Sequence, residues 1–110
     1  MHMRIKTELD REKQDKFVEG VQHLAELNME IFKEKNAKYG NSFYDNLKDY
    51  GFLTLLIRLA EKTNRLEELI YRYEELKEID DDESILDTLM DISNYCLMGA
   101  EFYNQMVKHE

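Results

Sequence analysis

The acidic residues near the C-terminal end of the sequence form a pattern that could bind a cation. Asp87, Asp91 and Asn94 are spaced by four and three residues, so in a helix their side chains return to nearly the same direction. Two carboxylates one turn apart among largely apolar neighbours need a cation beside them, because desolvation and mutual repulsion both oppose the charged state. The pattern therefore predicts one of three arrangements: a bound Mg²⁺ or Mn²⁺, an arginine or lysine from another helix, or a stripe that faces water.

A ladder of alternating charges lies earlier in the sequence. Its members recur every three or four residues and are Arg58, Glu61, Arg65, Glu68 and Arg72. Such alternation is typical of a helix face in contact with water. In the alternative interpretation, the first three of these residues and Lys62 line a pocket against the helix that carries the aspartates.

Lys35 and Asn36 occupy helix positions at which the surrounding pattern places apolar residues. A buried lysine needs an anionic partner, which here would be Asp87, Asp91 or a phosphate group of a ligand. Alternatively, the Lys35 side chain extends its ammonium group into water at the fraying end of a helix.

Helices are the elements that the spacing of apolar residues predicts. Apolar residues recur every three or four positions over about 8–38, 47–78 and 83–107, with a fresh start near Gly51. The segment 39–45 contains Gly, Asn, Ser and Asp and predicts a loop, whereas the acidic run at 80–83 favours a helix N-terminus. With no proline and four glycines, we expect an all-α fold: an antiparallel bundle of three to four helices in one domain over 1–110.

The net charge restricts the kinds of partner. Fifteen Lys and Arg against 24 Asp and Glu give a formal charge of −9, which repels the phosphate backbone of nucleic acid. We therefore expect no stable binding to duplex nucleic acid. A small phosphorylated ligand is compatible with this charge where cations cluster locally.

The lack of a long apolar run and the presence of a single cysteine indicate a cytoplasmic protein. No run of about 18 apolar residues or signal-peptide pattern occurs, so we expect neither membrane insertion nor secretion. Cys96 is the only cysteine and lies in an apolar stretch. It predicts a small buried core thiol, not a disulfide or a zinc site, which need several ligands.

Three blocks of the sequence carry a resemblance to a known family. They are KNAKYGNS at 35–42, RLAEKTNRL at 58–66 and DTLMDISNY at 87–95. In this order and spacing they resemble the nucleotide modification associated domain family of phages and bacteria, and the likeness covers about 30–102. That family is distantly similar to the MazG-like all-α nucleoside triphosphate pyrophosphatases, which bind Mg²⁺ through acidic residues of two adjacent helices.

The resemblance implies a MazG-like fold, a nucleotide ligand and a set of site residues. It places catalysis and binding of Mg²⁺ (or Mn²⁺) at Glu61, Asp87 and Asp91. It places nucleotide binding at Lys35, Asn36, Lys38, Tyr39, Asn41, Arg58, Lys62, Arg65 and Asn94. The sequence departs from the pyrophosphatase pattern because Arg65 and Thr88 stand where that pattern has carboxylates. The alternatives are therefore an Mg²⁺-dependent pyrophosphohydrolase, a non-catalytic nucleotide binder and a helical interaction module.

The apolar content of the helices also predicts self-association. Three helices of this kind, one of them apolar nearly all round, carry more apolar surface than a three-helix monomer readily covers. We expect a homodimer or a higher homo-oligomer, most simply with two-fold symmetry. The resemblance to dimeric and tetrameric pyrophosphatases implies the same.

Overall fold

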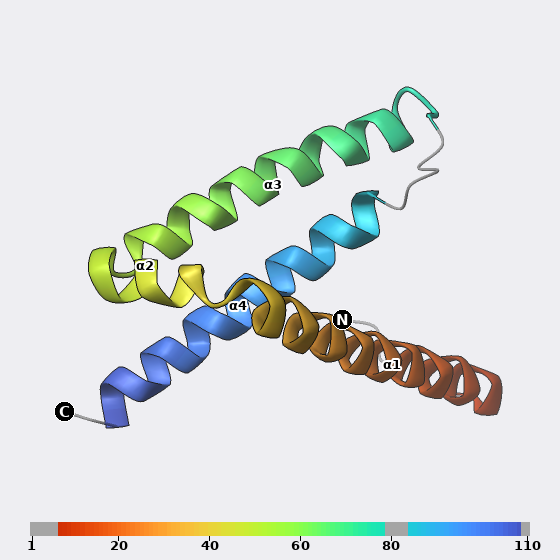
Figure 1. Cartoon of the computed structure of the whole chain (residues 1–110). Coiled ribbons are helices and arrows are strands. Elements are labelled where there is room, and N and C mark those ends of the chain that lie inside the picture. The colour runs from red at the N-terminus through yellow and green to blue at the C-terminus, as the bar shows by residue number, and fades with distance from the viewer. Residues whose placement is uncertain (1–6, 79–83, 109–110) are drawn as a thin grey trace, which may run out of the picture. The chain divides into compact units, whose positions relative to one another are not determined.

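Every regular element in the part of the chain that the computed structural model describes, residues 7–78 and 84–108, is an α-helix (Figure 1). The helices are α1 (Glu8–Tyr39), α2 (Ser42–Tyr50), α3 (Leu53–Glu74) and α4 (Ser84–Lys108). The all-α prediction is confirmed for these residues. The acidic run at 80–83, predicted to start the last helix, lies outside them. No helix in these ranges is both long enough and apolar enough to cross a membrane.

The predicted loop at 39–45 is wrong for 42–45, which form the first turn of α2. The side-chain oxygen of Asn41 accepts a hydrogen bond from the backbone N–H of Tyr44 at 3.1 Å and thereby caps this helix. At the other end, Gly51 has φ +71° and donates its backbone N–H to the carbonyl of Leu47 at 2.8 Å. Asn, Ser and Asp start helices as readily as they form turns, so here they mark a helix N-terminus.

The chain divides into two compact units, 1–38 and 39–110. In the first unit, α1 begins where the Thr7 hydroxyl accepts the backbone N–H of Asp10 at 3.1 Å. The apolar side chains along one face of this helix are exposed to solvent; among them are Phe17, Val21, Leu24, Leu27 and Ile31. The prediction of one domain over 1–110 remains a prediction.

In the second unit, α3 and α4 form an antiparallel pair, and α2 packs beside the N-terminal end of α3 (Figure 1). Aromatic side chains join α4 to the segments before α3: the rings of Phe43 and Tyr95 lie 4.9 Å apart, and those of Phe52 and Phe102 lie 5.5 Å apart, edge to face. Leu47 of α2 is only 1% exposed and forms the centre of this core. The core of the second unit thus consists of the α3–α4 pair, with α2 packed against both helices.

A glycine permits the close approach of α3 and α4. A Cβ atom added at Gly99 would lie 2.5 Å from Cδ2 of Leu55, closer than real Cβ contacts. The Leu55 side chain therefore packs against the bare backbone of α4 at this point. A larger residue at position 99 would collide with this leucine.

Replacing Gly99 with leucine is expected to lower the free energy of unfolding by about 1–3 kcal/mol, because a bulky side chain forces Leu55 and the α3 backbone to move. Denaturant titration followed by circular dichroism measures the change. Gly20 provides the control, since an added Cβ meets nothing within 4 Å there. Equal stability of the Gly99→Leu and Gly20→Leu proteins would show that α3 and α4 are not in close contact at Gly99.

Cys96 is exposed, so the prediction of a buried core thiol is wrong. The reason is the direction in which α4 packs. Its inward face carries Thr88, Gly99, Tyr95 and Phe102, and Cys96 lies outside this face. Thr88 is buried, and its hydroxyl donates to the backbone carbonyl of Ser84 at 2.7 Å. An apolar neighbourhood in the sequence does not specify which apolar face of a helix is covered.

Candidate functional site

An ion pair joins the two long helices of the second unit. Nζ of Lys62 on α3 lies 3.1 Å from Oδ2 of Asp91 on α4, and the two side chains are 28% and 39% exposed. Of the three arrangements predicted for the acidic residues, this is the one in which a lysine from another helix neutralises an aspartate. The ion pair also brings together Lys62, which was predicted to line a pocket with the first residues of the charge ladder, and one of the two aspartates predicted to need a cation.

The charges of the ladder face solvent, with Arg58 partly exposed and the other four residues exposed. Arg58 Nη1 lies 3.1 Å from Glu61 Oε2 one turn further along α3, and Arg72 pairs with Glu68 at 2.5 Å. These pairs agree with the interpretation of the ladder as a helix face in water. The exposed Arg65 has no hydrogen-bond or ion-pair partner among the described residues.

Each of the three carboxylates predicted to bind a metal has a different environment in the structure. Asp91 is paired with Lys62, Glu61 is paired with Arg58, and Asp87 is exposed. Within residues 7–78 and 84–108, no three His, Cys, Asp or Glu side chains lie close enough together to hold a metal ion. This donor set does not fit a three-carboxylate magnesium site, since a metal at Asp91 would have to displace the Lys62 ammonium group.

The other predicted ligand residues are distributed over α1, the cap of α2, and α4. Lys35, Asn36 and Lys38 are exposed in the last turns of α1, in the first unit, and Tyr39 is the last residue of that helix. The side chain of Asn41 caps α2. Asn94 is half-buried on α4. Within the second unit, the structure therefore brings together Lys62 and Asp91, and separately Arg58 and Glu61.

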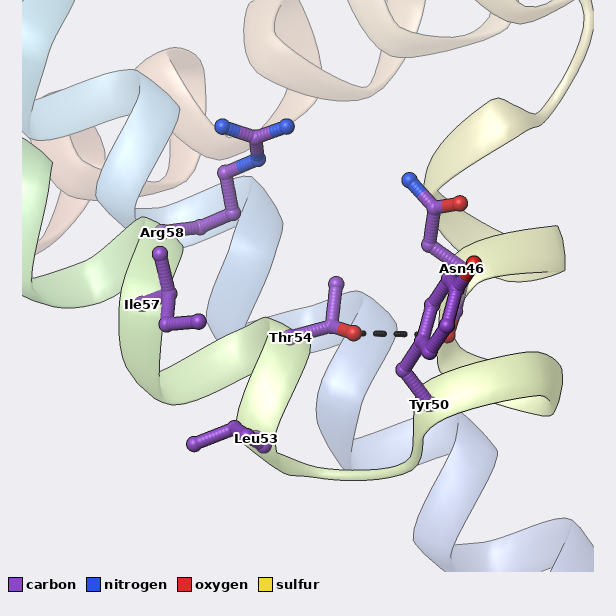
Figure 2. A pocket seen from close by; sticks show the side chains of 6 residues that line it. All are labelled: Asn46, Tyr50, Leu53, Thr54, Ile57 and Arg58. Carbon is purple, nitrogen blue, oxygen red and sulfur yellow. Dashed lines mark hydrogen bonds between the residues drawn. The ribbon is translucent and has the colours of Figure 1, made fainter.

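A cavity of about 320 Å³ opens between α2 and α3 (Figure 2). It is lined by Asn46, Tyr50, Leu53, Thr54, Ile57 and Arg58. The Thr54 hydroxyl donates to the backbone carbonyl of Asn46 at 3.3 Å and ties the two walls together. In Figure 2 the side chains of Asn46 and Arg58 extend toward the same end of the cavity, one from each helix. Arg58 is the predicted ligand residue that lines this cavity.

The cavity combines a mainly apolar lining with a few polar groups. Leu53 and Ile57 supply aliphatic surface, and the ring of Tyr50 is 72% exposed and free to stack. The Arg58 guanidinium and the Asn46 amide offer hydrogen bonds at the rim. Such a lining suits a planar ring that carries an anionic substituent.

The sequence contains a signal for this cavity that was not used for the prediction of a site. Its residues fall into pairs four apart on each side of Gly51: Asn46 with Tyr50 before it, and Thr54 with Arg58 after it. Residues four apart lie on one face of a helix. Recognising Asn41 as an N-cap would have placed the first pair on a helix beside the second.

We expect the Lys62–Asp91 ion pair to contribute little to stability. A double-mutant cycle with Lys62→Met and Asp91→Asn should give a coupling energy of about 0.2–1 kcal/mol, because solvent screens both partly exposed groups. The more exposed pair Lys48 and Asp45, 3.8 Å apart on α2, is the control and should show weaker coupling. Coupling of several kcal/mol in the first cycle would mean that the pair is more deeply buried than the structure shows.

Comparison with known proteins identifies no relative of this chain. No protein-family model, no curated protein and no solved structure matches it. The resemblance carried by the three sequence blocks therefore stays a prediction, and the function is inferred from the site.

Proposed function

We propose that this protein binds nucleotides, with the base in the α2–α3 cavity and the phosphates beside Arg58 and Arg65 of α3. The observation that carries the proposal is an apolar cavity with an arginine, Arg58, at its rim. Its volume of about 320 Å³ lies at the lower end of the range of ligand pockets, roughly 300–1,000 Å³. A cavity of this size suits the base, and the phosphates would lie outside it.

The base would be held by stacking and by one amide. The exposed ring of Tyr50 gives a flat surface, and Leu53 and Ile57 give an apolar wall against which a base loses contact with water. The Asn46 side chain has both donors and acceptors for the edge of a base or for a sugar hydroxyl. Any base has a face that can stack, so this lining does not select one base strongly.

The phosphates would be held by two arginines. Arg58 uses one N–H group for Glu61 and keeps others for a phosphate oxygen. Arg65 lies seven residues further along, in nearly the same direction and roughly 10 Å away along the helix axis. Since Arg65 has no partner in the described part of the chain, a phosphate contact would cost no existing ion pair. A triphosphate extending from Arg58 toward Arg65 would contact both.

Hydrolysis of the bound nucleotide is a second candidate function, and the environment of Asp87 supports it. This exposed carboxylate, one turn from Asp91, has no hydrogen-bond or ion-pair partner among the described residues. A carboxylate in this condition can orient or deprotonate an attacking water. Magnesium would come with the phosphates of the nucleotide, which commonly supply part of its coordination.

Isothermal titration with deoxynucleoside triphosphates, monophosphates, nucleosides and inorganic pyrophosphate, each with and without Mg²⁺, tests the proposal. Triphosphates should bind more tightly than nucleosides, which lack phosphates, and than pyrophosphate, which lacks a base. No binding by any of them at millimolar concentration would reject nucleotide binding and favour a helical interaction module. Release of phosphate or pyrophosphate by the wild-type protein but not by Asp87→Asn would support hydrolysis. Binding without release would indicate that the protein binds nucleotides without hydrolysing them.

A further inference from the structure

Glu61 lies between two arginines on the solvent-facing side of α3. Arg58 precedes it by three residues and Arg65 follows it by four, so the three side chains share one side of the helix. Oε2 of Glu61 lies 3.1 Å from Nη1 of Arg58. Arg65 has no hydrogen-bond or ion-pair partner in the described part of the chain. Glu61 therefore stands on the path along α3 that leads from the cavity to Arg65.

From this placement we infer that Glu61 competes with the phosphates of the nucleotide for Arg58 and thereby lowers the affinity of the site. The inference rests on the proposed function, in which Arg58 binds phosphate at the rim of the cavity. Carboxylate and phosphate oxygens accept hydrogen bonds from the same guanidinium N–H groups. Glu61 occupies Nη1, one of the two terminal nitrogens of Arg58, so a bidentate phosphate contact through both of them requires the carboxylate to move.

Arg58 has a single acidic neighbour along the helix. The positions three and four residues away on either side carry Thr54, Leu55, Glu61 and Lys62. Removal of the Glu61 charge therefore leaves Arg58 without an ion pair within α3 and frees its terminal nitrogens for a ligand.

The exchange of the carboxylate for a phosphate costs little. The side chains of Arg58 and Glu61 are 42% and 57% exposed, and water screens ion pairs that are exposed to this extent. A displaced Glu61 can turn to Arg65, since a glutamate followed four residues later by a basic residue is the favoured order of such a pair in a helix. Its charge still repels phosphates bound one turn away. The competition therefore weakens nucleotide binding without preventing it.

A glutamate beside an arginine can have the opposite role, because it can hold the guanidinium in the orientation that a ligand needs. The two roles predict opposite signs. Removal of the Glu61 charge tightens binding if the carboxylate competes with phosphate, and weakens binding if the carboxylate orients Arg58. The exposure of both side chains favours competition, since an ion pair in water does not hold a side chain rigidly.

Glu61→Gln tests the inference, because glutamine keeps the length and shape of the side chain without its charge. In isothermal titration without Mg²⁺, this variant should bind a deoxynucleoside triphosphate about 3–10-fold more tightly than the wild-type protein, because both the ion pair and the repulsion are lost. It should bind the corresponding nucleoside as the wild-type protein does, because a nucleoside carries no phosphate.

Glu67→Gln is the matched control. Glu67 is exposed and lies nine residues after Arg58, about two and a half turns, and so on the opposite side of α3. Both variants lose one negative charge, so an effect of overall charge would appear in both. We expect Glu67→Gln to bind the triphosphate as the wild-type protein does. Circular dichroism checks that all three proteins are helical.

Weaker or unchanged triphosphate binding by Glu61→Gln would overturn the inference and leave the proposed function in place. An equal gain in Glu67→Gln would overturn it too, because the effect would then come from overall charge. A gain for the nucleoside as large as that for the triphosphate would place the effect of Glu61 at the base, against the inference. If none of the three proteins bound nucleotide, the proposed function itself would be rejected, and this inference with it.

Discussion

Replacing Arg58 with methionine is expected to weaken nucleoside triphosphate binding by roughly 10–150-fold, equivalent to about 1.5–3 kcal/mol, the scale of a hydrogen bond to a charged group. The reason is that Arg58 is the cation at the rim of the cavity, and methionine keeps much of its aliphatic length without the charge. Isothermal titration measures the change. Because Arg58 is partly exposed and paired with Glu61, the thermal midpoint should change little.

Arg72→Met is the matched control for this prediction. Arg72 lies on the same helix and is also paired with a glutamate, Glu68, but it does not line the cavity. Loss of affinity in both variants to the same extent would indicate that only the overall charge of α3 matters. Loss in neither would remove Arg58 from the site.

Replacing Leu47 with alanine should lower the free energy of unfolding by about 2–5 kcal/mol. Leu47 is the hydrophobic side chain that is most completely buried in the described part of the chain, and its removal leaves a cavity where α2 packs on α3 and α4. Denaturant titration gives the value. Since α2 carries one wall of the candidate site, the variant should also bind nucleotide less tightly.

Leu56→Ala serves as the comparison for Leu47→Ala. Leu56 on α3 is 63% exposed, so its truncation should cost no more than about 0.5 kcal/mol. Similar losses in the two variants would contradict the packing of α2 in the core. A stable Leu47→Ala protein with weakened nucleotide binding would instead show that α2 serves the site more than the fold.

The long helices could be predicted from the sequence because their apolar period extends over many turns. The predicted range 8–38 ends one residue before α1 (Glu8–Tyr39), and the predicted end of the last helix at 107 is one residue before the end of α4 (Ser84–Lys108). The fresh start near Gly51 also proved to be the boundary between α2 and α3. Only the N-terminal half of the short helix α2 was predicted wrongly, because nine residues give few periods and its Asn41 cap resembles a turn signal.

The partners of polar residues were harder to predict than the helices. The spacing of Asp87 and Asp91 indicates a shared stripe, but only the register of α3 against α4 places Lys62 beside Asp91 and leaves Asp87 exposed. The same register brings Leu55 of α3 against Gly99 of α4, and both Lys62 and Leu55 are far from the aspartates in the sequence. For the same reason the period of α4 could not indicate that Cys96 faces outward.

The candidate cavity shows the same limit of local patterns. Arg58 was expected to bind a ligand together with Lys62 and Arg65, against the helix that carries the aspartates. The cavity that Arg58 lines opens toward α2 instead, with Asn46 and Tyr50 as the opposite wall. Two elements that meet across a turn cannot be recognised as a pocket until both are known to be helices.

Mapping the bound nucleotide by backbone amide chemical shifts is the most direct test of the proposed function. Nitrogen-15-labelled protein would be titrated with a deoxynucleoside triphosphate, first without and then with Mg²⁺. We expect the largest changes in amide chemical shift at 46–58, around the α2–α3 cavity, and further changes along α3 to Arg65. Shifts confined to α1, or no shifts at millimolar nucleotide, would contradict the proposed function.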